Sequence, residues 1–513
     1  MMRLAFLYDK RLTQPELLNA FDGCIATTCP VTDCTVLLRW GNPEGPDNIS
    51  QAVLNRKQPL KNSLDKEKVF DILKLNRIRR PRFVSPSPAS PYPLVGKWNN
   101  LTSGNGREAV IQTYDKALVS GADFFVEHVN TVKKYNIYFF DLNSFWVTKK
   151  VAVKTNTPRN NITPSWVYEE IPLDLDRDTV KTCLLAQRAI YILGLDFGMV
   201  HAAIDTKGRP VILDITPVPV LPLKAINLFS GQVKKFTADI TRQITDSGSL
   251  LDNRIVLGAD PEFMLKDPKT GKIVYPSDFL SMDGPLGYDE RSENRAGRLY
   301  PLAEVRPVPD QCPLNLVKKI KGILKQAVSL IPPDIEWLAG SLPFENYQIG
   351  GHIHFSNIGI NCRLIRALDN YLAIPLMLME DPGKSSKRRR QYGWLGSIRP
   401  KPHGGFEYRT PGSWLVSPEM AEGCLCLAKI VATEYRLLTR DYFSDIELQK
   451  AFYQSKKYYF YDIFNEIWED LKKTQLFSKY STYLNPIADL INRGGHWDET
   501  CDIRKSWNLL PPP

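Results

Sequence analysis

The segments GGHIHF (residues 350–355) and RRRQYGWLGSIRPKPHGGFEYRTPGSW (residues 388–414) decide how the second half of this chain folds. His352 and His354 lie two residues apart, as do Glu407 and Arg409. On a β-strand, this spacing places both members of a pair on the same face. Imidazole, carboxylate and guanidinium groups on one sheet face indicate a site for a metal ion and a phosphate. The alternative is a half-buried sheet whose polar face is simply hydrated.

The length and composition of the chain indicate a globular protein of several domains. Its 513 residues exceed what one hydrophobic core normally holds, and 43% are hydrophobic and 24% charged. We find no run of about 18 apolar residues. The first ten residues, MMRLAFLYDK, carry charges that disfavour a secretory signal. We therefore expect a cytoplasmic protein without a membrane segment.

The cysteines and the net charge exclude little. Nine cysteines in so long a chain do not make a disulfide scaffold. Cys24, Cys29 and Cys34 lack a complete zinc-binding spacing, so we expect these three to be small buried side chains. A formal charge of +10 permits an anionic partner. It does not distinguish nucleotide phosphates from an acidic polymer or a nucleic acid.

The first half predicts helices at 64–78, with Asp65 as the N-cap, and at 180–194. Strands are expected within 122–153, and a hairpin is expected at 195–219, with its turn at 205–208. Between the first helix and these strands lie a proline-rich connector and a loop with Lys97, Gly104 and Gly106. Such a loop can hold phosphates, because glycine lets backbone N–H groups approach the oxygens and lysine supplies a charge.

This order of elements over residues 60–222 resembles an ATP-grasp domain. The resemblance implies that Lys97 and the loop of Gly104 and Gly106 contact ATP phosphates, that Glu127 lies beside the nucleotide, and that the hairpin acid Asp214 binds magnesium. Two positions depart from the family pattern. His201 stands where the family usually has Asp, and Thr216 stands where it has Asn. Because magnesium prefers hard oxygen ligands, we expect a weakened site, and the domain is either active or a degenerate scaffold.

The second half carries further acidic and basic pairs at strand spacing. Asp260 and Glu262 lie two residues apart, as do Glu304 and Arg306. Two acids on one strand face repel each other unless a cation lies between them. The run KSSKRRR at 384–390 predicts a solvated loop, or a phosphate contact through its position beside Arg399. Helices are expected at 314–330, at 364–378 and over the last 90 or so residues.

The ordered motifs GADPEF, AEVRP, GGHIHF, RRQYGWLGSIR and GFEYRTPGSWL, over about residues 254–425, resemble the glutamine-synthetase-like amidoligases of the phage-type carboxylate–amine ligase group. The resemblance implies a curved antiparallel sheet that binds ATP through two or three divalent ions. It implies that His354 either shares the metal role or packs behind it. It also implies two sets of residues. The implied metal ligands are Asp260, Glu262, Glu304, His352 and Glu407, and the implied contacts to the transferring phosphate or substrate carboxylate are Arg306, Arg399 and Arg409. The alternatives are a core imidazole for one histidine and a structural ion pair for Arg306.

The sequence thus predicts an α+β protein with an ATP-grasp-like domain at 1–225, a linker helix at 226–253 and a glutamine-synthetase-like domain at 254–513. The predicted activity is ATP-dependent amide formation, with Mg²⁺ or Mn²⁺, between a carboxylate and an amine on small molecules or peptides. Two alternatives stay open. One is a kinase-like phosphotransferase, and the other is a nucleotide-regulated protein that binds an acidic or nucleic-acid partner. Acid-rich strands argue against nucleic acid, because they repel phosphates unless metal is bound.

Overall fold

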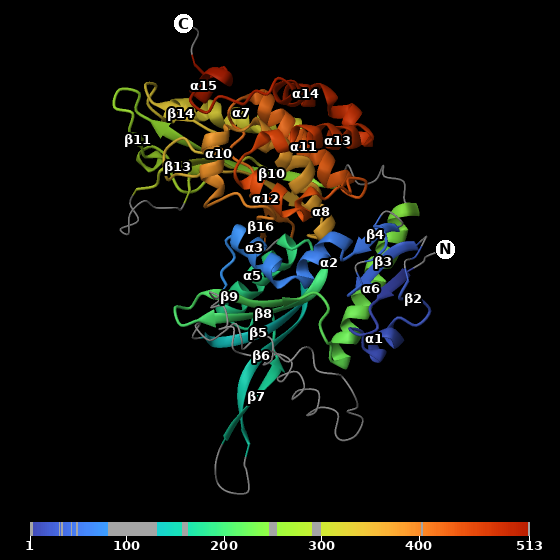
Figure 1. Cartoon of the computed structure of the whole chain (residues 1–513). Coiled ribbons are helices and arrows are strands. Elements are labelled where there is room, and N and C mark those ends of the chain that lie inside the picture. Colours follow the sequence, from blue (N-terminus) through green and yellow to red (C-terminus); the bar gives the residue numbers. More distant parts are fainter. Residues whose placement is uncertain are drawn as a thin grey trace. The chain divides into compact units, whose positions relative to one another are not determined.

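A computed structural model of the chain divides it into two compact units, Met1–Asp246 and Ser247–Pro513. Both units combine helices and sheets, which confirms a mixed architecture (Figure 1). No helix in the described part of the chain has the length and apolarity needed to cross a bilayer. The structure describes residues 4–29, 31, 34–42, 44–47, 50–80, 131–155, 163–245, 254–289, 299–401 and 404–510.

The first unit begins with a four-stranded parallel sheet in the order β2-β1-β3-β4. Strand β3 is almost continuously buried, as expected for a parallel strand that is covered on both faces. Helix α1 (Pro15–Ala20) packs against helix α6 (Leu223–Thr245), which also contacts β3. The strands are β1 (Leu4–Tyr8), β2 (Ile25–Thr27), β3 (Cys34–Trp40) and β4 (Ser50–Leu54).

An aromatic core joins α6 to the strands of the first unit. The rings of Trp40 and Phe197 stack with centroids 5.4 Å apart, and the Phe229 ring contacts both edge-on. Phe229 and Val233 of α6 are buried in this core. Helix α6 therefore belongs to the first unit, although the sequence predicts a linker from residue 226 onward.

The second sheet of the first unit has the order β7-β6-β5-β8-β9 and is antiparallel throughout. Figure 1 shows β6 and β7 projecting beyond the rest of this sheet, and helix α5 (Arg177–Ile192) packs on β8 and β9. The predicted hairpin is confirmed, with Gly208 at φ +71° in its turn. The strands are β5 (Thr131–Phe140), β6 (Asn143–Thr155), β7 (Thr163–Glu170), β8 (Phe197–Asp205) and β9 (Pro210–Thr216).

Helices α2 (Lys57–Leu64) and α3 (Lys66–Leu75) complete the described part of the first unit. The predicted cap of α3 is confirmed, since the Asp65 carboxylate accepts from the backbone N–H groups of Glu67 and Lys68 at 3.0 and 3.2 Å. The phosphate-loop residues Lys97, Gly104 and Gly106, the acid Glu127 and the strand expected at 122–129 lie outside the described residues.

The second unit is built on an antiparallel sheet of eight strands with the path β12-β13-β10-β15-β17-β16, to which β11 and β14 add by pairing with β10. This confirms the predicted antiparallel strands at the motifs. The strands are β10 (Val256–Lys266), β11 (Ile273–Val274), β12 (Leu286–Tyr288), β13 (Leu302–Val305), β14 (Glu336–Leu338), β15 (Gly351–Ser356), β16 (Ile398–Pro400) and β17 (Phe406–Tyr408).

Helices cover one face of this sheet. Helix α7 contacts β10 and β13, α11 contacts β15, and α14 packs on α11 (Figure 1). Ile353, Phe355 and Tyr408 are completely buried and alternate along their strands with the polar motif residues. The polar residues therefore occupy the opposite face. The helices are α7 (Pro313–Leu330), α8 (Cys362–Ala367), the π-helical η4 (Leu368–Ala373), α9 (Ile374–Met379), α10 (Pro382–Arg389), α11 (Pro418–Glu434), α12 (Ile446–Tyr453), α13 (Tyr461–Lys472), α14 (Gln475–Asn492) and α15 (Ile503–Ser506), with short 3-10 turns η3 (Pro276–Asp278), η5 (Tyr442–Ser444) and η6 (Lys457–Tyr459).

Candidate metal and phosphate site

The strand register brings the predicted site residues into rows across the sheet. Gly258 of β10 pairs with His354 of β15, His354 with Glu407 of β17, and Glu407 with Arg399 of β16. Two residues further along β10, Asp260 pairs with His352. Pairing across four strands thus gathers residues that are almost 150 positions apart in sequence.

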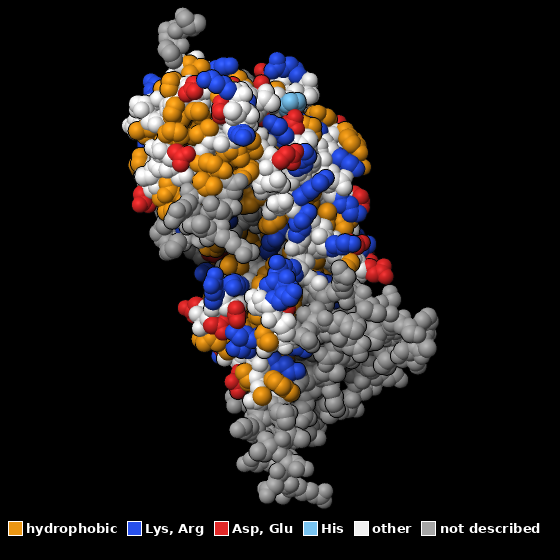
Figure 2. All heavy atoms as spheres, turned by 90° about the vertical axis from the view of Figure 1, so that its left-hand side faces the viewer, with side chains coloured by type: hydrophobic (Ala, Val, Ile, Leu, Met, Phe, Trp, Pro, Cys, Tyr) orange, Lys and Arg blue, Asp and Glu red, His pale blue; other side chains and the backbone are white. Residues whose placement is uncertain are grey.

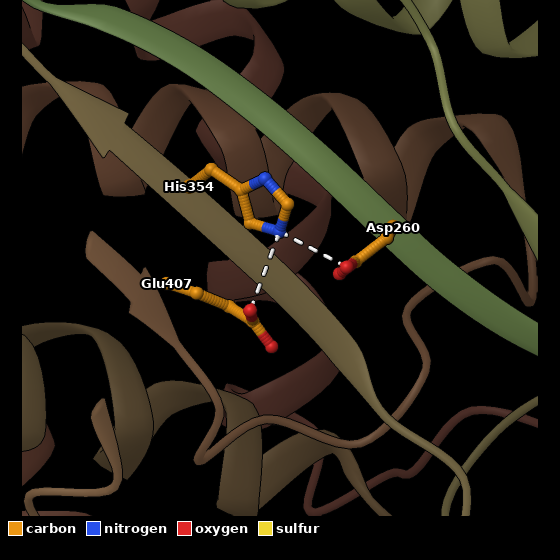
Figure 3. A group of neighbouring side chains, drawn as sticks. All are labelled: Asp260, His354 and Glu407. Atoms are coloured by element: carbon orange, nitrogen blue, oxygen red, sulfur yellow. Dashed lines mark ion pairs between the residues drawn. The ribbon is translucent and has the colours of Figure 1, made fainter. Parts of the chain in front are cut away.

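Three side chains of these rows converge on one point (Figure 3). The imidazole Nε2 of His354 lies 3.0 Å from a carboxylate oxygen of Asp260 and 4.0 Å from one of Glu407. One ligand atom from each residue lies within 4.8 Å of the others. His354 Nε2 and Glu407 Oε1 are buried and make no hydrogen bond in the described structure. Nitrogen and oxygen donors that face each other in this way fit a divalent ion.

Two glycines of the motifs make room for the imidazole rings. A Cβ on Gly258 would lie 3.3 Å from the Cβ of His354. A Cβ on Gly350 would lie 2.2 Å from Nε2 of His352, which is closer than atoms can approach. A side chain at position 350 would therefore displace the His352 ring, whereas one at position 258 would crowd His354 by only a few tenths of an ångström.

His352 lies beside the three-residue cluster, with both ring nitrogens engaged. Its Nδ1 is 3.0 Å from Asp260 Oδ1, and its Nε2 is 2.8 Å from the Tyr392 hydroxyl. The His352 side chain is buried, whereas that of His354 is 26% exposed. This geometry favours His354 as the ligand that faces solvent and His352 as the residue that orients Asp260.

Three cations surround the buried carboxylate of Glu407. Arg399 Nε lies 2.7 Å away, Lys401 Nζ 2.8 Å and Arg409 Nε 3.0 Å. Their side chains are 50%, 22% and 28% exposed, respectively, so all three are partly accessible from solvent. Such a group of cations beside a metal cluster suits an anionic ligand.

Glu262 and Glu304 form the next pair along the sheet, with register partners on β10 and β13. A Glu262 oxygen accepts from the Gly350 N–H at 2.7 Å. Burial, followed by the charge of Asp260, raises the pKa of Glu304 to about 8. A carboxylate that is difficult to ionise without a counter-ion is consistent with a nearby cation position.

The Arg306 guanidinium is held by three groups. Its Nε lies 2.8 Å from Glu304 Oε2, and it donates to the backbone oxygens of Met282 and Tyr288 at 2.7 and 3.1 Å. These contacts favour the structural ion pair that the sequence left open for Arg306.

The ionisable core of the site is strongly coupled. Burial acts to raise the pKa of Asp260, but the charges of His352 and His354 and the contact with His352 outweigh it and hold that pKa below its usual range. Burial acts to lower the pKa of His352, and the Asp260 charge reverses this to a net rise. For Glu407, burial and Asp260 act upward, but His352, Lys401 and Arg399 produce a net lowering of its pKa.

The sequence prediction of a solvated or phosphate-binding loop at 384–390 is wrong, because the run is helical. These residues form helix α10, in which Arg388 and Arg389 are buried. Arg389 pairs with buried Glu380. Both guanidiniums thus hold the fold together, because buried arginine requires such partners. Arg388 donates to the backbone oxygens of Ile349, Thr410 and Pro411 at 2.7, 2.9 and 2.6 Å.

Three residues near the site escaped sequence reasoning. Lys401 follows Arg399 at strand spacing, so the same rule that found Arg409 would have found it. Tyr392 carries no spacing signal. Asp369 lies in the π-helical segment η4, where its carboxylate accepts from the Tyr408 hydroxyl at 2.6 Å and the Gly396 N–H at 2.7 Å. It thereby anchors the segments that carry Glu407 and Arg399.

In the first unit, the expected magnesium ligand Asp214 is already paired. Its carboxylate lies 2.5 Å from Lys66 Nζ. His201, opposite Asp214 in the hairpin register, has its Nδ1 2.7 Å from Asn136 Oδ1. Burial lowers the pKa of His201 to about 4, so its ring is neutral at physiological pH.

A sheet face that gathers acids, imidazoles and cations is a candidate site for a metal ion and an anionic ligand. Residues 257–509, nearly the whole second unit, match the model of the family described as phage phiEco32-like COOH.NH2 ligase-type 2. No curated protein matches the chain. The family match supports a ligase that joins carboxyl and amino groups.

Several solved structures are similar to part of the chain. D-alanine–D-alanine ligase from Bacillus anthracis is 11% identical, with a TM-score of 0.29, over 48% of this chain and 100% of that chain. The ATP-grasp ligase PsnB complexed with a minimal precursor is 9% identical, with a TM-score of 0.30, over 47% and 99%. The macrocyclase MdnC, bound with the precursor peptide MdnA from Microcystis aeruginosa MRC, is 10% identical, with a TM-score of 0.27, over 47% and 100%.

Proposed function

We propose that the chain is an ATP-dependent carboxylate–amine ligase whose chemistry takes place on the polar sheet face of the second unit. The observation that carries this proposal is the convergence of Asp260, His354 and Glu407 beside the cations Arg399 and Arg409. The family match of residues 257–509 supports the same reaction class. We also propose that the second unit has a glutamine-synthetase-like architecture.

The metal ligands are proposed to be Asp260, Glu407 and His354, with Glu262 and Glu304 facing a further cation position. Mg²⁺ or Mn²⁺ held there would neutralise charge on the ATP phosphates. The single imidazole nitrogen among carboxylate oxygens suits Mn²⁺ at least as well as Mg²⁺. His352 is assigned to the orientation of Asp260, through their 3.0 Å contact.

Arg399, Lys401 and Arg409 are the groups that hold the transferring phosphate. A substrate carboxylate oxygen attacks the γ-phosphorus of ATP, ADP leaves, and an acyl phosphate forms. The amine nitrogen then attacks the acyl carbon, inorganic phosphate leaves, and the nitrogen loses a proton to give the amide. Positioning and charge neutralisation account for most catalysis of phosphoryl transfer, and arginines in a partly buried site provide both.

The ATP-grasp-like first unit is proposed to bind nucleotide weakly and not to turn it over by itself. Asp214 is paired with Lys66, and His201 and Thr216 stand where the family pattern has Asp and Asn, so the hairpin has few hard oxygen ligands for magnesium. This supports the degenerate alternative for the site that the resemblance implies. The same proposal assigns phosphate contacts to Lys97, Gly104 and Gly106, and a position beside the nucleotide to Glu127.

The partners are proposed to be small-molecule or peptide substrates, one with a carboxylate and one with an amine. Figure 2 shows Lys and Arg side chains interspersed with acidic and hydrophobic ones on the displayed face of the second unit.

The test is a screen of the purified protein with ATP and Mg²⁺ or Mn²⁺ against amino acids and short peptides. Mass spectrometry should detect a product that corresponds to two substrates minus one water, with ADP and phosphate in equal amounts. A phosphorylated product that accumulates without any amine requirement would instead establish a kinase-like transfer. Salt-sensitive nucleic-acid binding without ATP turnover would establish a binding protein.

A further inference from the structure

Tyr392 lies between the two halves of the site. Its ring is flanked by the guanidinium carbons of Arg388 and Arg409, at 5.3 and 5.1 Å from the ring centroid. Cations at these distances are attracted by the electron-rich ring faces. The ring therefore has a defined position in the site without being a metal ligand itself.

The Tyr392 hydroxyl contacts both the metal side and the phosphate side of the site. It lies 2.8 Å from His352 Nε2, and Arg409 donates to it from its NH2 group. On the metal side, His352 continues to Asp260 through Nδ1 at 3.0 Å. On the phosphate side, Arg409 Nε lies 3.0 Å from Glu407.

The orientation of His352 follows from these contacts in either of its protonation states. The Asp260 carboxylate only accepts, so Nδ1 carries the proton that faces it. Nε2 then either accepts from the Tyr392 hydroxyl or donates to its oxygen. In both cases, the hydroxyl fixes the rotation of the ring and, with it, the carboxylate of Asp260.

The position of the Tyr392 ring is set by the buried Arg388. That guanidinium is fixed by three backbone oxygens on either side of the sheet motifs. The adjacent Gly393 has φ +74°, and a Cβ there would lie 2.1 Å from an Arg388 nitrogen. The Tyr392 ring thus packs against a guanidinium that cannot shift without breaking several buried hydrogen bonds.

We propose that Tyr392 is a positioning residue of the ligase site, whose hydroxyl couples the metal-binding carboxylate of Asp260, through His352, to the guanidinium of Arg409. This inference rests on the proposed function. Outer contacts of this kind typically change metal affinity by about 10- to 100-fold when removed. The hydroxyl therefore acts on metal affinity and on turnover together, whereas a purely structural hydroxyl acts on stability alone.

The test is Tyr392→Phe, which keeps the ring between the two guanidiniums and removes only the hydroxyl. Mn²⁺ binding is measured by electron paramagnetic resonance, and kcat and KM for ATP are measured with the substrate pair from the screen. We expect about 10-fold weaker Mn²⁺ binding. We also expect a fall in kcat of similar size, with a thermal midpoint within about 4 °C of the unmodified protein.

The matched control is Tyr371→Phe, which removes a hydroxyl that contacts Asp470 at 3.1 Å. This contact involves none of the site residues, so Mn²⁺ affinity should be unchanged. A second control is the cycle of Tyr392→Phe with His352→Ala. If the hydroxyl acts through His352, the double variant should bind Mn²⁺ about as weakly as His352→Ala alone.

The outcomes separate the inference from the proposed function. Parent-like Mn²⁺ affinity and kcat in Tyr392→Phe would overturn the positioning role while leaving the ligase site intact. Additive effects in the cycle would likewise overturn coupling through His352. Absence of Mn²⁺ binding by the unmodified protein would overturn the metal site, and the role of Tyr392 with it.

Discussion

Glu407→Gln is the substitution that separates charge from shape in the site. Glutamine fills the same volume but removes the negative charge that Arg399, Lys401 and Arg409 contact at 2.7, 2.8 and 3.0 Å. It also removes one carboxylate from the cluster with Asp260 and His354. We expect the fold to persist and the ligase reaction to be lost.

The magnitudes follow from the exposure of the partners. Hydrogen bonds to a charged group contribute about 1.5–3 kcal/mol each, and solvent screening reduces this for the half-exposed Arg399. Relief of the repulsion between Glu407 and Asp260 offsets part of the loss. We expect the free energy of unfolding to fall by about 2 kcal/mol. Loss of a metal ligand and of phosphate positioning should lower kcat/KM by at least about 10³-fold, or roughly 4 kcal/mol.

The assay combines chemical denaturation, Mn²⁺ binding and product formation by mass spectrometry. The matched control is Glu345→Gln, which breaks an ion pair with Lys387 whose members are 71% and 51% exposed. That pair should contribute little to stability, and its loss should leave turnover unchanged. A folded Glu407→Gln protein that forms product within tenfold of the parent rate would refute the assignment of Glu407.

Three further predictions concern neighbouring residues. Arg388→Met should lower the free energy of unfolding by about 2–5 kcal/mol in a denaturant titration, because it removes a donor from three buried carbonyl oxygens, of which that of Pro411 keeps the Gly351 N–H. The same change at exposed Arg390 should cost under about 0.5 kcal/mol. Burial raises the pKa of Glu304 to about 8 from its ordinary 4.5, so the folded state binds this proton more tightly than the unfolded state does. The stability of the metal-free protein should therefore fall as pH rises from about 4.5 to about 8. Thermal melts of Glu304→Gln should show a flatter dependence on pH, and an unchanged dependence would contradict the raised pKa. Arg409→Lys keeps the charge but loses the planar guanidinium that contacts both Glu407 and Tyr392. The fall in kcat/KM should correspond to a loss of at least about 2 kcal/mol of transition-state stabilisation. Normal turnover by this variant would show that Arg409 is structural.

Strand periodicity accounts for the part of the site that the sequence predicts. Spacing of two residues placed His352 with His354, and Asp260 with Glu262, on one face, and the register joins them. The same rule could not rank the two histidines. Their roles depend on which groups each ring contacts, and the Tyr392 hydroxyl contacts Nε2 of His352.

The basic run at 384–390 could not be assigned from composition. Buried Arg388 is satisfied by backbone oxygens from residues 349, 410 and 411, which come close only after the sheet forms. Sequence reasoning treats a cluster of cations as solvated because isolated burial of charge is costly, and it cannot see such distant acceptors. The π-helical segment around Asp369 could not be predicted either, because its sequence has the periodicity of an ordinary α-helix.

The first unit illustrates the converse. Substitution of the expected magnesium ligands by His201 and Thr216 predicted a weakened site from sequence alone. The structure adds two contacts that are consistent with this prediction, between Asp214 and Lys66 and between His201 and Asn136. Helix α6 was misplaced because an amphipathic stripe does not reveal which core it joins.

The most direct test of the central claim is a side-by-side measurement of amide formation by Asp260→Asn and Asp214→Ala, with mass spectrometry of all products. The two changes remove a carboxylate from the candidate site of the second and first units, respectively. If the second unit carries the chemistry, Asp214→Ala should stay within about tenfold of the parent, or roughly 1.4 kcal/mol, while Asp260→Asn loses at least about 100-fold. A parent-like rate for Asp260→Asn, or a once-ligated intermediate that accumulates with Asp214→Ala, would contradict this account and assign bond formation to the first unit.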